Sequence, residues 1–111
     1  MAENILQACV SNPKDLGSLV EYSEDSVVSK TIINKPVGTV TLFAFDKGQS
    51  LSEHTSPYDA LVQVIDGTAM LTIDGKDIEV ADGQLIIMPG GVPHSVNAEE
   101  KFKMILVMIR S

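Results

Sequence analysis

Residues 83–94 read Gly83-Gln-Leu-Ile-Ile-Met-Pro-Gly-Gly-Val-Pro-His94 and end on one of the two histidines in the chain. A short expected strand, Leu85 to Met88, runs into Pro89-Gly90-Gly91, where proline breaks a sheet ladder and glycine lets the chain reverse. Pro93 then leads directly to His94. So constrained an approach fixes the position of one imidazole, which is either a ligand or a hydrogen-bonded histidine of the core.

The intervals within this segment resemble the second motif of the cupin superfamily. Gly83, Pro89, Gly91 and His94 stand where that motif has its glycines, its proline and its histidine. The motif normally closes with an Asn four residues after the histidine, and this chain has Ala98 at that position. The resemblance implies that a partner motif lies upstream.

The upstream segment is similar to the first cupin motif. Gly48, His54 and Gly67 occupy its glycine and first histidine positions, whereas Ser56 and Ala60 stand where the family has a second His and a Glu. The resemblance implies an all-β fold, an antiparallel double-stranded β-helix or jelly-roll barrel. Because half of the usual metal ligands are replaced, it does not imply a particular reaction.

The composition limits the class of protein. The 111 residues suffice for one domain, and 44% hydrophobic and 21% charged residues are typical of a globular protein. A net charge of −7 argues against nucleic acids and anionic membranes as partners. The single Cys9 excludes an internal disulfide and suits a reducing cytosol. The N-terminus does not resemble a signal peptide, and the longest apolar run, Met104 to Ile109, is too short to span a bilayer. We therefore predict a cytoplasmic protein.

The chain divides into an arm and a barrel. Residues 1–25 show mixed patterns and are expected to form an arm packed on the barrel or on a dimer partner, with a short helix across Asp15–Val20. Residues 26–111 are expected to form the barrel, because β-branched residues and alternation predict about eight or nine strands. The clearest expected strands cover 27–33, 39–45, 60–65, 68–73, 76–81, 85–88, 94–96 and 102–109.

Asp-Gly pairs recur at 66–67, 74–75 and 82–83, an interval of eight each time. Both residues of such a pair tolerate positive φ, so each pair predicts a two-residue hairpin turn. Successive hairpins make an antiparallel meander. A sheet of this size is expected to close into a barrel or a double-sheet roll, because closure protects its edges.

The last expected strand is apolar on both faces. Met104, Leu106 and Met108 alternate with Ile105, Val107 and Ile109. One face lines the barrel, and the other must be covered by the arm or by a second subunit. We predict a homodimer, with cover by the arm alone as the alternative.

Strand periodicity suggests a pocket, because residues two apart share a face of a strand. His54 and Ser56 then point into the barrel with Ala60, Val62 and Val64, while His94, Val96 and Ala98 form the facing wall and Tyr58 lies at the rim. Two imidazoles, one hydroxyl and an apolar lining are typical of a small-molecule site. The expected ligand-binding residues are His54, Ser56, Tyr58, Ala60, Val62, His94 and Val96.

His54 and His94 are also the candidate metal ligands. The sequence does not establish a cofactor. The candidate cofactor is one divalent transition metal: Zn, Ni, Fe, Mn or Cu. Catalytic metal sites usually have three protein ligands, and this face offers two. Glu53 and Asp59 have the wrong parity for a third, although a bulge at Pro57-Tyr58 would turn Asp59 inward.

Three functions remain open. The first is small-molecule binding in a barrel anchored by two histidines, with a weak metal or none. The second is a metal-dependent cupin enzyme, such as a dioxygenase or isomerase, that uses His54 and His94 as ligands. The third is a metal-free enzyme resembling the sugar epimerases, in which the imidazoles act as acid and base near neutral pH. Whether the protein is an enzyme stays open.

Overall fold

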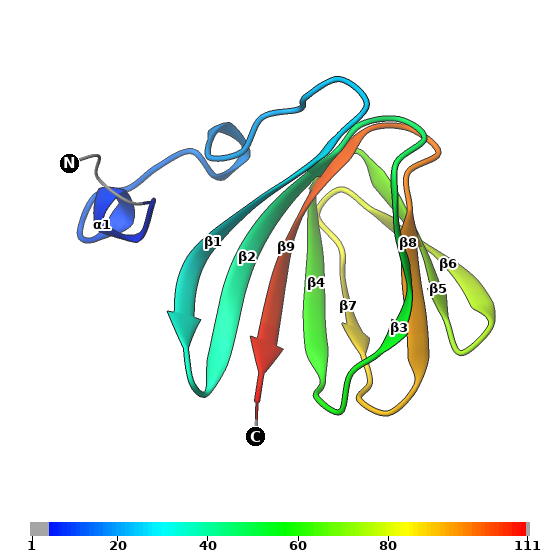
Figure 1. Ribbon diagram of the computed structural model, residues 1–111. Helices are drawn as coiled ribbons and strands as arrows, with labels where there is room; N and C mark the ends of the chain where they lie inside the picture. Colours follow the sequence, from blue (N-terminus) through cyan, green and yellow to red (C-terminus); the bar gives the residue numbers. More distant parts are fainter. Residues whose placement is uncertain (1–4, 111) are drawn as a thin grey trace.

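The computed structural model describes residues 5–110, which form nine strands preceded by two short helices (Figure 1). The helices are α1 (Ile5–Cys9) and η1 (Leu16–Ser18). The strands are β1 (Val27–Lys35), β2 (Gly38–Phe45), β3 (Ser50–Thr55), β4 (Ala60–Asp66), β5 (Thr68–Ile73), β6 (Lys76–Ala81), β7 (Leu85–Met88), β8 (Pro93–Asn97) and β9 (Phe102–Ile109). No helix of this part of the chain is long and apolar enough to cross a membrane.

The strands form two antiparallel sheets, which face each other as the two walls of a jelly roll (Figure 1). The five-stranded sheet has the order β1-β2-β9-β4-β7, and the four-stranded sheet has the order β3-β8-β5-β6. The predicted all-β, antiparallel jelly-roll fold is confirmed.

The expected meander is wrong, because consecutive strands mostly lie in different sheets. Only the middle Asp-Gly pair is a hairpin turn: Asp74 and Gly75 have φ angles of 51° and 79° and join the paired strands β5 and β6. The pairs at 66–67 and 82–83 instead carry the chain from one sheet to the other. At the first crossing, a Cβ on Gly67 would lie 2.6 Å from the Lys101 carbonyl oxygen, so only glycine fits there.

The core lies between the sheets. Phe45 of β2 and Phe102 of β9 are fully buried and stack with their ring centroids 4.6 Å apart. The alternation expected for β4 holds, since Ala60, Val62 and Val64 are all buried in this core. The four-stranded sheet contributes the following buried residues: Ala69, Leu71, Ile73, Val80 and Val96.

A second apolar cluster lies on the outer face of the five-stranded sheet. Val20 of the N-terminal arm is fully buried there against Leu42 and Ala44 of β2, and Ile105 of β9 packs at its side. The last strand is therefore covered on both faces at this end, as its apolar pattern predicts. Residues 1–4 of the expected arm lie outside the described residues.

Polar contacts also hold the arm to the sheet. The Tyr22 hydroxyl donates to an Asp66 carboxylate oxygen at 2.6 Å, and the Lys103 ammonium donates to the Gly17 carbonyl at 2.7 Å. The Lys101 and Lys103 ammonium groups each lie 4.8 Å from the centroid of the Tyr22 ring. Burial raises the pKa of Tyr22 above its usual value, and the hydrogen bond to Asp66 adds to this shift. Tyr22 therefore stays a neutral hydrogen-bond donor.

Candidate functional site

The two histidines lie side by side on neighbouring strands. His54 on β3 is the direct partner of His94 on β8, in the four-stranded sheet. The sequence-based expectation that His94 and Val96 form a wall facing His54 is therefore wrong. That expectation used the parity of each strand alone, and parity does not say which strands pair.

A β-bulge turns His54 toward its partner. Leu51 pairs with Val96 and His54 pairs with His94, so three steps on β3 match two steps on β8. The extra residue lets both Leu51 and His54 face inward, and Leu51 packs on the core. The bulge considered at Pro57-Tyr58 is thus replaced by one that precedes His54 and leaves Asp59 unaffected.

The imidazole rings meet through their Nε2 atoms, which are 3.1 Å apart. The ring centroids are 4.3 Å apart and the rings cross at 72°. The two environments differ: His94 is only 4% exposed, whereas His54 lies exposed on the edge strand β3. One ring is anchored in the core, and the other reaches it from the rim.

Hydrogen bonding sets the proton position on His54. Its Nδ1 lies 2.8 Å from the Ser52 carbonyl oxygen, which can only accept, so Nδ1 carries the proton. Nε2 of neutral His54 is then a bare acceptor. In the hydrogen bond between the rings, His94 must therefore donate from its own Nε2, which leaves His94 Nδ1 without a proton.

The hydrogen bonds of the histidine pair leave His94 Nδ1 unsatisfied. Among the buried side-chain nitrogen and oxygen atoms of residues 5–110, His94 Nδ1 alone lacks a hydrogen-bond partner. Burial lowers the pKa of His94 below its usual 6.5, and the nearby His54 lowers it further. The Val92 backbone acts in the opposite direction, although its geometry falls short of an ordinary hydrogen bond. His94 is therefore neutral around pH 7.

Two tight loops next to the histidines are clamped together. The Ser56 carbonyl accepts from the Gly91 N–H and an Asp59 carboxylate oxygen accepts from the Gly90 N–H, both at 2.8 Å. A Cβ on Gly90 would lie 2.5 Å from the Pro57 carbonyl oxygen, so the loops approach too closely for any larger residue. Sequence reasoning missed this clamp, although Pro57 and the Gly-Gly pair mark both loops.

The clamp uses groups that the sequence assigned to the pocket. The Ser56 hydroxyl accepts from the Tyr58 N–H at 3.2 Å and so helps to shape the loop after β3. Tyr58 is half-buried, and Ala60, Val62 and Val96 are buried core residues. The structure brings His54 and His94 into contact. The ligand-binding roles of these two histidines and of the other expected residues stay predictions.

A search of protein families gives a match that agrees with this architecture. The family described as Cupin domain matches residues 41–110, which is more than half of the chain. The protein belongs to the cupin family.

Several solved structures resemble this cupin. A conserved protein of unknown function from Streptococcus pyogenes is 39% identical over 91% of this chain and 89% of its own, with a TM-score of 0.87. A cupin 2 conserved barrel domain protein from Leptotrichia buccalis is 43% identical, with a TM-score of 0.83; the match covers 85% of this chain and 46% of that one. A cupin superfamily protein from Desulfitobacterium hafniense is 27% identical over 90% and 92% of the two chains, with a TM-score of 0.86. No curated protein matches the chain.

The donor set of this cupin fits a metal in part. Two imidazole nitrogens 3.1 Å apart suit two metal bonds of about 2.0–2.1 Å, and the hydrogen bond from His54 Nδ1 to the Ser52 carbonyl is a usual support for a ligating histidine. Within the described residues, however, no three His, Cys, Asp or Glu side chains are placed so that they could hold a metal ion together. The Asp59 carboxylate, the candidate third ligand, is bonded to Gly90 instead. Water or a bound molecule would have to complete the coordination.

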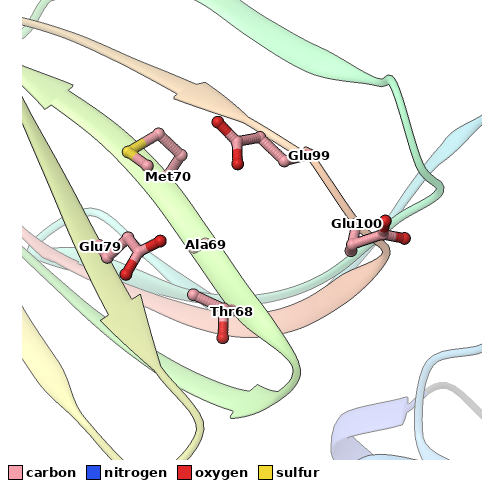
Figure 2. Close-up of a pocket in the computed structure, with 6 residues that line it drawn as sticks. All are labelled: Thr68, Ala69, Met70, Glu79, Glu99 and Glu100. Atoms are coloured by element: carbon pink, nitrogen blue, oxygen red, sulfur yellow. The ribbon is translucent and has the colours of Figure 1, made fainter.

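A cavity elsewhere in this cupin has a different character. It has a volume of about 210 Å³ and lies on β5 and β6, with neither histidine in its lining (Figure 2). Its lining comprises Thr68, Ala69, Met70, Glu79, Glu99 and Glu100. The Glu100 carboxylate lies 3.4 Å from the exposed Lys47 ammonium, so part of this negative charge is already balanced.

Proposed function

We propose that this cupin barrel binds a small molecule beside its histidine pair, with His54 and His94 as the polar anchors. The observation that carries the proposal is the pair itself, with its Nε2 atoms 3.1 Å apart and a buried, unpartnered Nδ1 on His94. A buried acceptor without a partner costs about 1–3 kcal/mol. The hydrogen bond between the rings therefore carries this free-energy cost, and a ligand can replace that hydrogen bond.

The replacement follows from the proton positions. If His94 moves its proton to Nδ1, that nitrogen changes from a bare acceptor to a donor, for which the Val92 backbone is the candidate acceptor. Both Nε2 atoms are then bare and converge on one point. A group that donates hydrogen bonds, such as a hydroxyl or an amine, is the ligand chemistry that this point accepts. The apolar side chains of the inner face would hold the rest of the molecule.

The second candidate function is a metal-dependent cupin enzyme, for example a dioxygenase or an isomerase. The same two Nε2 atoms favour it, because a divalent transition metal (Zn, Ni, Fe, Mn or Cu) would occupy the point on which they converge. A metal held there supplies a Lewis acid for an oxygen atom of the substrate. His54 and His94 would hold it, with Ser52 orienting His54.

Elemental analysis combined with thermal unfolding separates these candidates. The protein is purified without chelator or nickel affinity, beside a His54→Ala variant and a matched Thr55→Ala control on the same exposed strand. Near-stoichiometric metal that is lost only in His54→Ala supports the metal-dependent enzyme. Absence of metal, with stabilisation of the wild type and Thr55→Ala by an alcohol, phenol or amine, supports ligand binding. If neither a metal nor such a molecule stabilises the wild type more than His54→Ala, both are wrong.

We also propose that residues 1–25 act as an arm on the barrel of residues 26–111, in a cytoplasmic homodimer. The burial of Val20 on the outer sheet face supports the arm. The single Cys9 is free, which suits a reducing compartment. The apolar pattern of β9 supports pairing with a second copy.

A further inference from the structure

Each histidine lies close to one of the two clamped loops, at the end of the barrel where these loops meet (Figure 1). The loop between β3 and β4, residues 56–59, begins two residues after His54. The loop between β7 and β8, residues 89–92, ends two residues before His94. Because so little chain separates each ring from its loop, a movement of one loop against the other changes the distance between the rings.

The strand ladder alone holds His54 weakly. Strand β3 is an edge strand, with β8 as its single neighbour in the sheet. The bulge interrupts the pairing between Leu51 and His54, and the pairing ends where Thr55 meets Pro93. Proline has no N–H to donate, so the ladder is short of a donor beside the histidines. A further tie is needed to fix the distance between the two rings.

Asp59 supplies the side chain of that tie. The bond from Gly91 to Ser56 joins backbone groups, whereas the bond from the Gly90 N–H ends on the Asp59 carboxylate at 2.8 Å. An ionised acceptor makes one of the stronger kinds of hydrogen bond. The backbone that carries this carboxylate is itself fixed, because the next residue, Ala60, is 3% exposed and pairs with Met88.

We infer that Asp59 is the positioning residue of the histidine pair: its carboxylate holds residues 89–92 in place and so keeps the two Nε2 atoms at 3.1 Å. Asp59 acts through the backbone of this loop. The inference rests on the proposed function in that the pair is its anchor, but the geometry of the pair can be measured without ligand or metal. The role requires an oxygen acceptor on a short side chain, which Asn also supplies.

Side-chain NMR of the two imidazoles in metal-free, ligand-free protein tests this role. In the wild type, the Nε2 proton that His94 donates to His54 should be protected from exchange with water. Asp59→Ala is expected to speed this exchange by ~10-fold or more, because it removes a charge-assisted hydrogen bond. Asp59→Asn keeps an acceptor at the same place and is expected to restore protection close to that of the wild type.

Asp46→Ala is the matched control. It removes a carboxylate that also accepts a backbone N–H at 2.8 Å, that of Asp25, but Asp46 follows β2 at the other end of the barrel (Figure 1). It is expected to leave the exchange of the His94 proton unchanged. Circular dichroism and thermal unfolding check that the variants are folded. Asp59→Ser replaces Asp59→Ala if that variant does not fold, because the serine hydroxyl stops one bond short of the carboxylate oxygen.

The outcomes separate the inference from the proposed function. A folded Asp59→Ala or Asp59→Ser variant that keeps the wild-type exchange rate overturns the role of Asp59 and leaves binding at the pair standing. An equal acceleration in Asp46→Ala also overturns it, since Asp59 would then act only through overall stability. If the wild type shows no proton shared between the rings, the pair is not formed, and the inference and the proposed anchor fail together.

Discussion

The outer faces of the two sheets differ in chemistry. On the four-stranded sheet, one row aligns Asp77, Thr72 and Ser95, and the Thr72 hydroxyl donates to an Asp77 carboxylate oxygen at 2.7 Å. On the five-stranded sheet, a row of cross-strand partners on the outer face consists of Ile87, Leu61 and Val107. The first face carries polar groups that can hydrogen-bond to each other or to solvent, whereas the second exposes aliphatic side chains such as Ile87.

The same contrast separates the histidine pair from the N-terminal arm. Both histidines lie on the sheet whose outer face is polar, and the arm and the row of Ile87, Leu61 and Val107 lie on the other sheet. Changes to one sheet's outer face are therefore expected to leave the inner face of the other sheet intact. Variants in the shared core, in the arm and at the buried histidine measure how independent the two sheets are.

The largest effect is expected in the core that both sheets share. Phe102→Ala removes a fully buried ring stacked at 4.6 Å on Phe45 and should lower the free energy of unfolding by about 3–5 kcal/mol, measured by urea denaturation. Ile87→Ala, at a solvent-exposed position of the outer row, serves for comparison and should change the free energy of the monomer far less. Equal losses would mean that the outer row belongs to the core, and the contrast between the faces would fail.

The next effect concerns the covered part of the outer face. Val20→Ala truncates a fully buried side chain of the arm and should lower the free energy of unfolding by about 2 kcal/mol. Val10→Ala is the control, because its side chain is exposed and its truncation should change stability by less than about 0.5 kcal/mol. If the two variants are equally stable, the arm is not an integral part of the sheet's cover.

A smaller effect is expected from pH, through the buried histidine of the four-stranded sheet. The pKa of His94 is lowered in the folded protein from 6.5, so the unfolded chain binds the proton more readily. In metal-free protein the stability from His94 is complete above pH 6.5 and falls as the pH drops toward the lowered pKa. The slope reaches at most ~1.4 kcal/mol per pH unit, and it should be absent in His94→Gln measured by urea denaturation at the same pH values. A slope that survives unchanged in His94→Gln belongs to other groups.

The smallest expected effect is a difference in tautomer between the two imidazoles. Because His54 Nδ1 must donate to the Ser52 carbonyl, neutral His54 should show a protonated Nδ1 and a bare Nε2 in ¹⁵N NMR spectra of the side chains. With only two histidines in the chain, both rings can be assigned by comparison with His54→Ala. A neutral His54 with its proton on Nε2 would contradict the hydrogen bond to Ser52 and the proton positions deduced for the pair.

Features that depend on near neighbours in the chain could be predicted from the sequence. The strands and their faces follow from the two-residue period of side chains, which is why Ala60, Val62 and Val64 were correctly expected inside. The resemblance to the cupin motifs implies the jelly roll, and the motif glycines Gly48, Gly67, Gly83 and Gly91 all have the positive φ that favours glycine. The family match over residues 41–110 agrees with that reading.

Pairing between distant strands could not be predicted in this way. The three Asp-Gly pairs have equal spacing, yet one makes a hairpin and two carry the chain between sheets, because only tertiary packing selects the partner of each strand. His54 and His94 are 40 residues apart, and their contact depends on the pairing of β3 with β8 and on a bulge before His54. Local sequence specifies which residues face inward, and the assembly of the two sheets decides which of them meet.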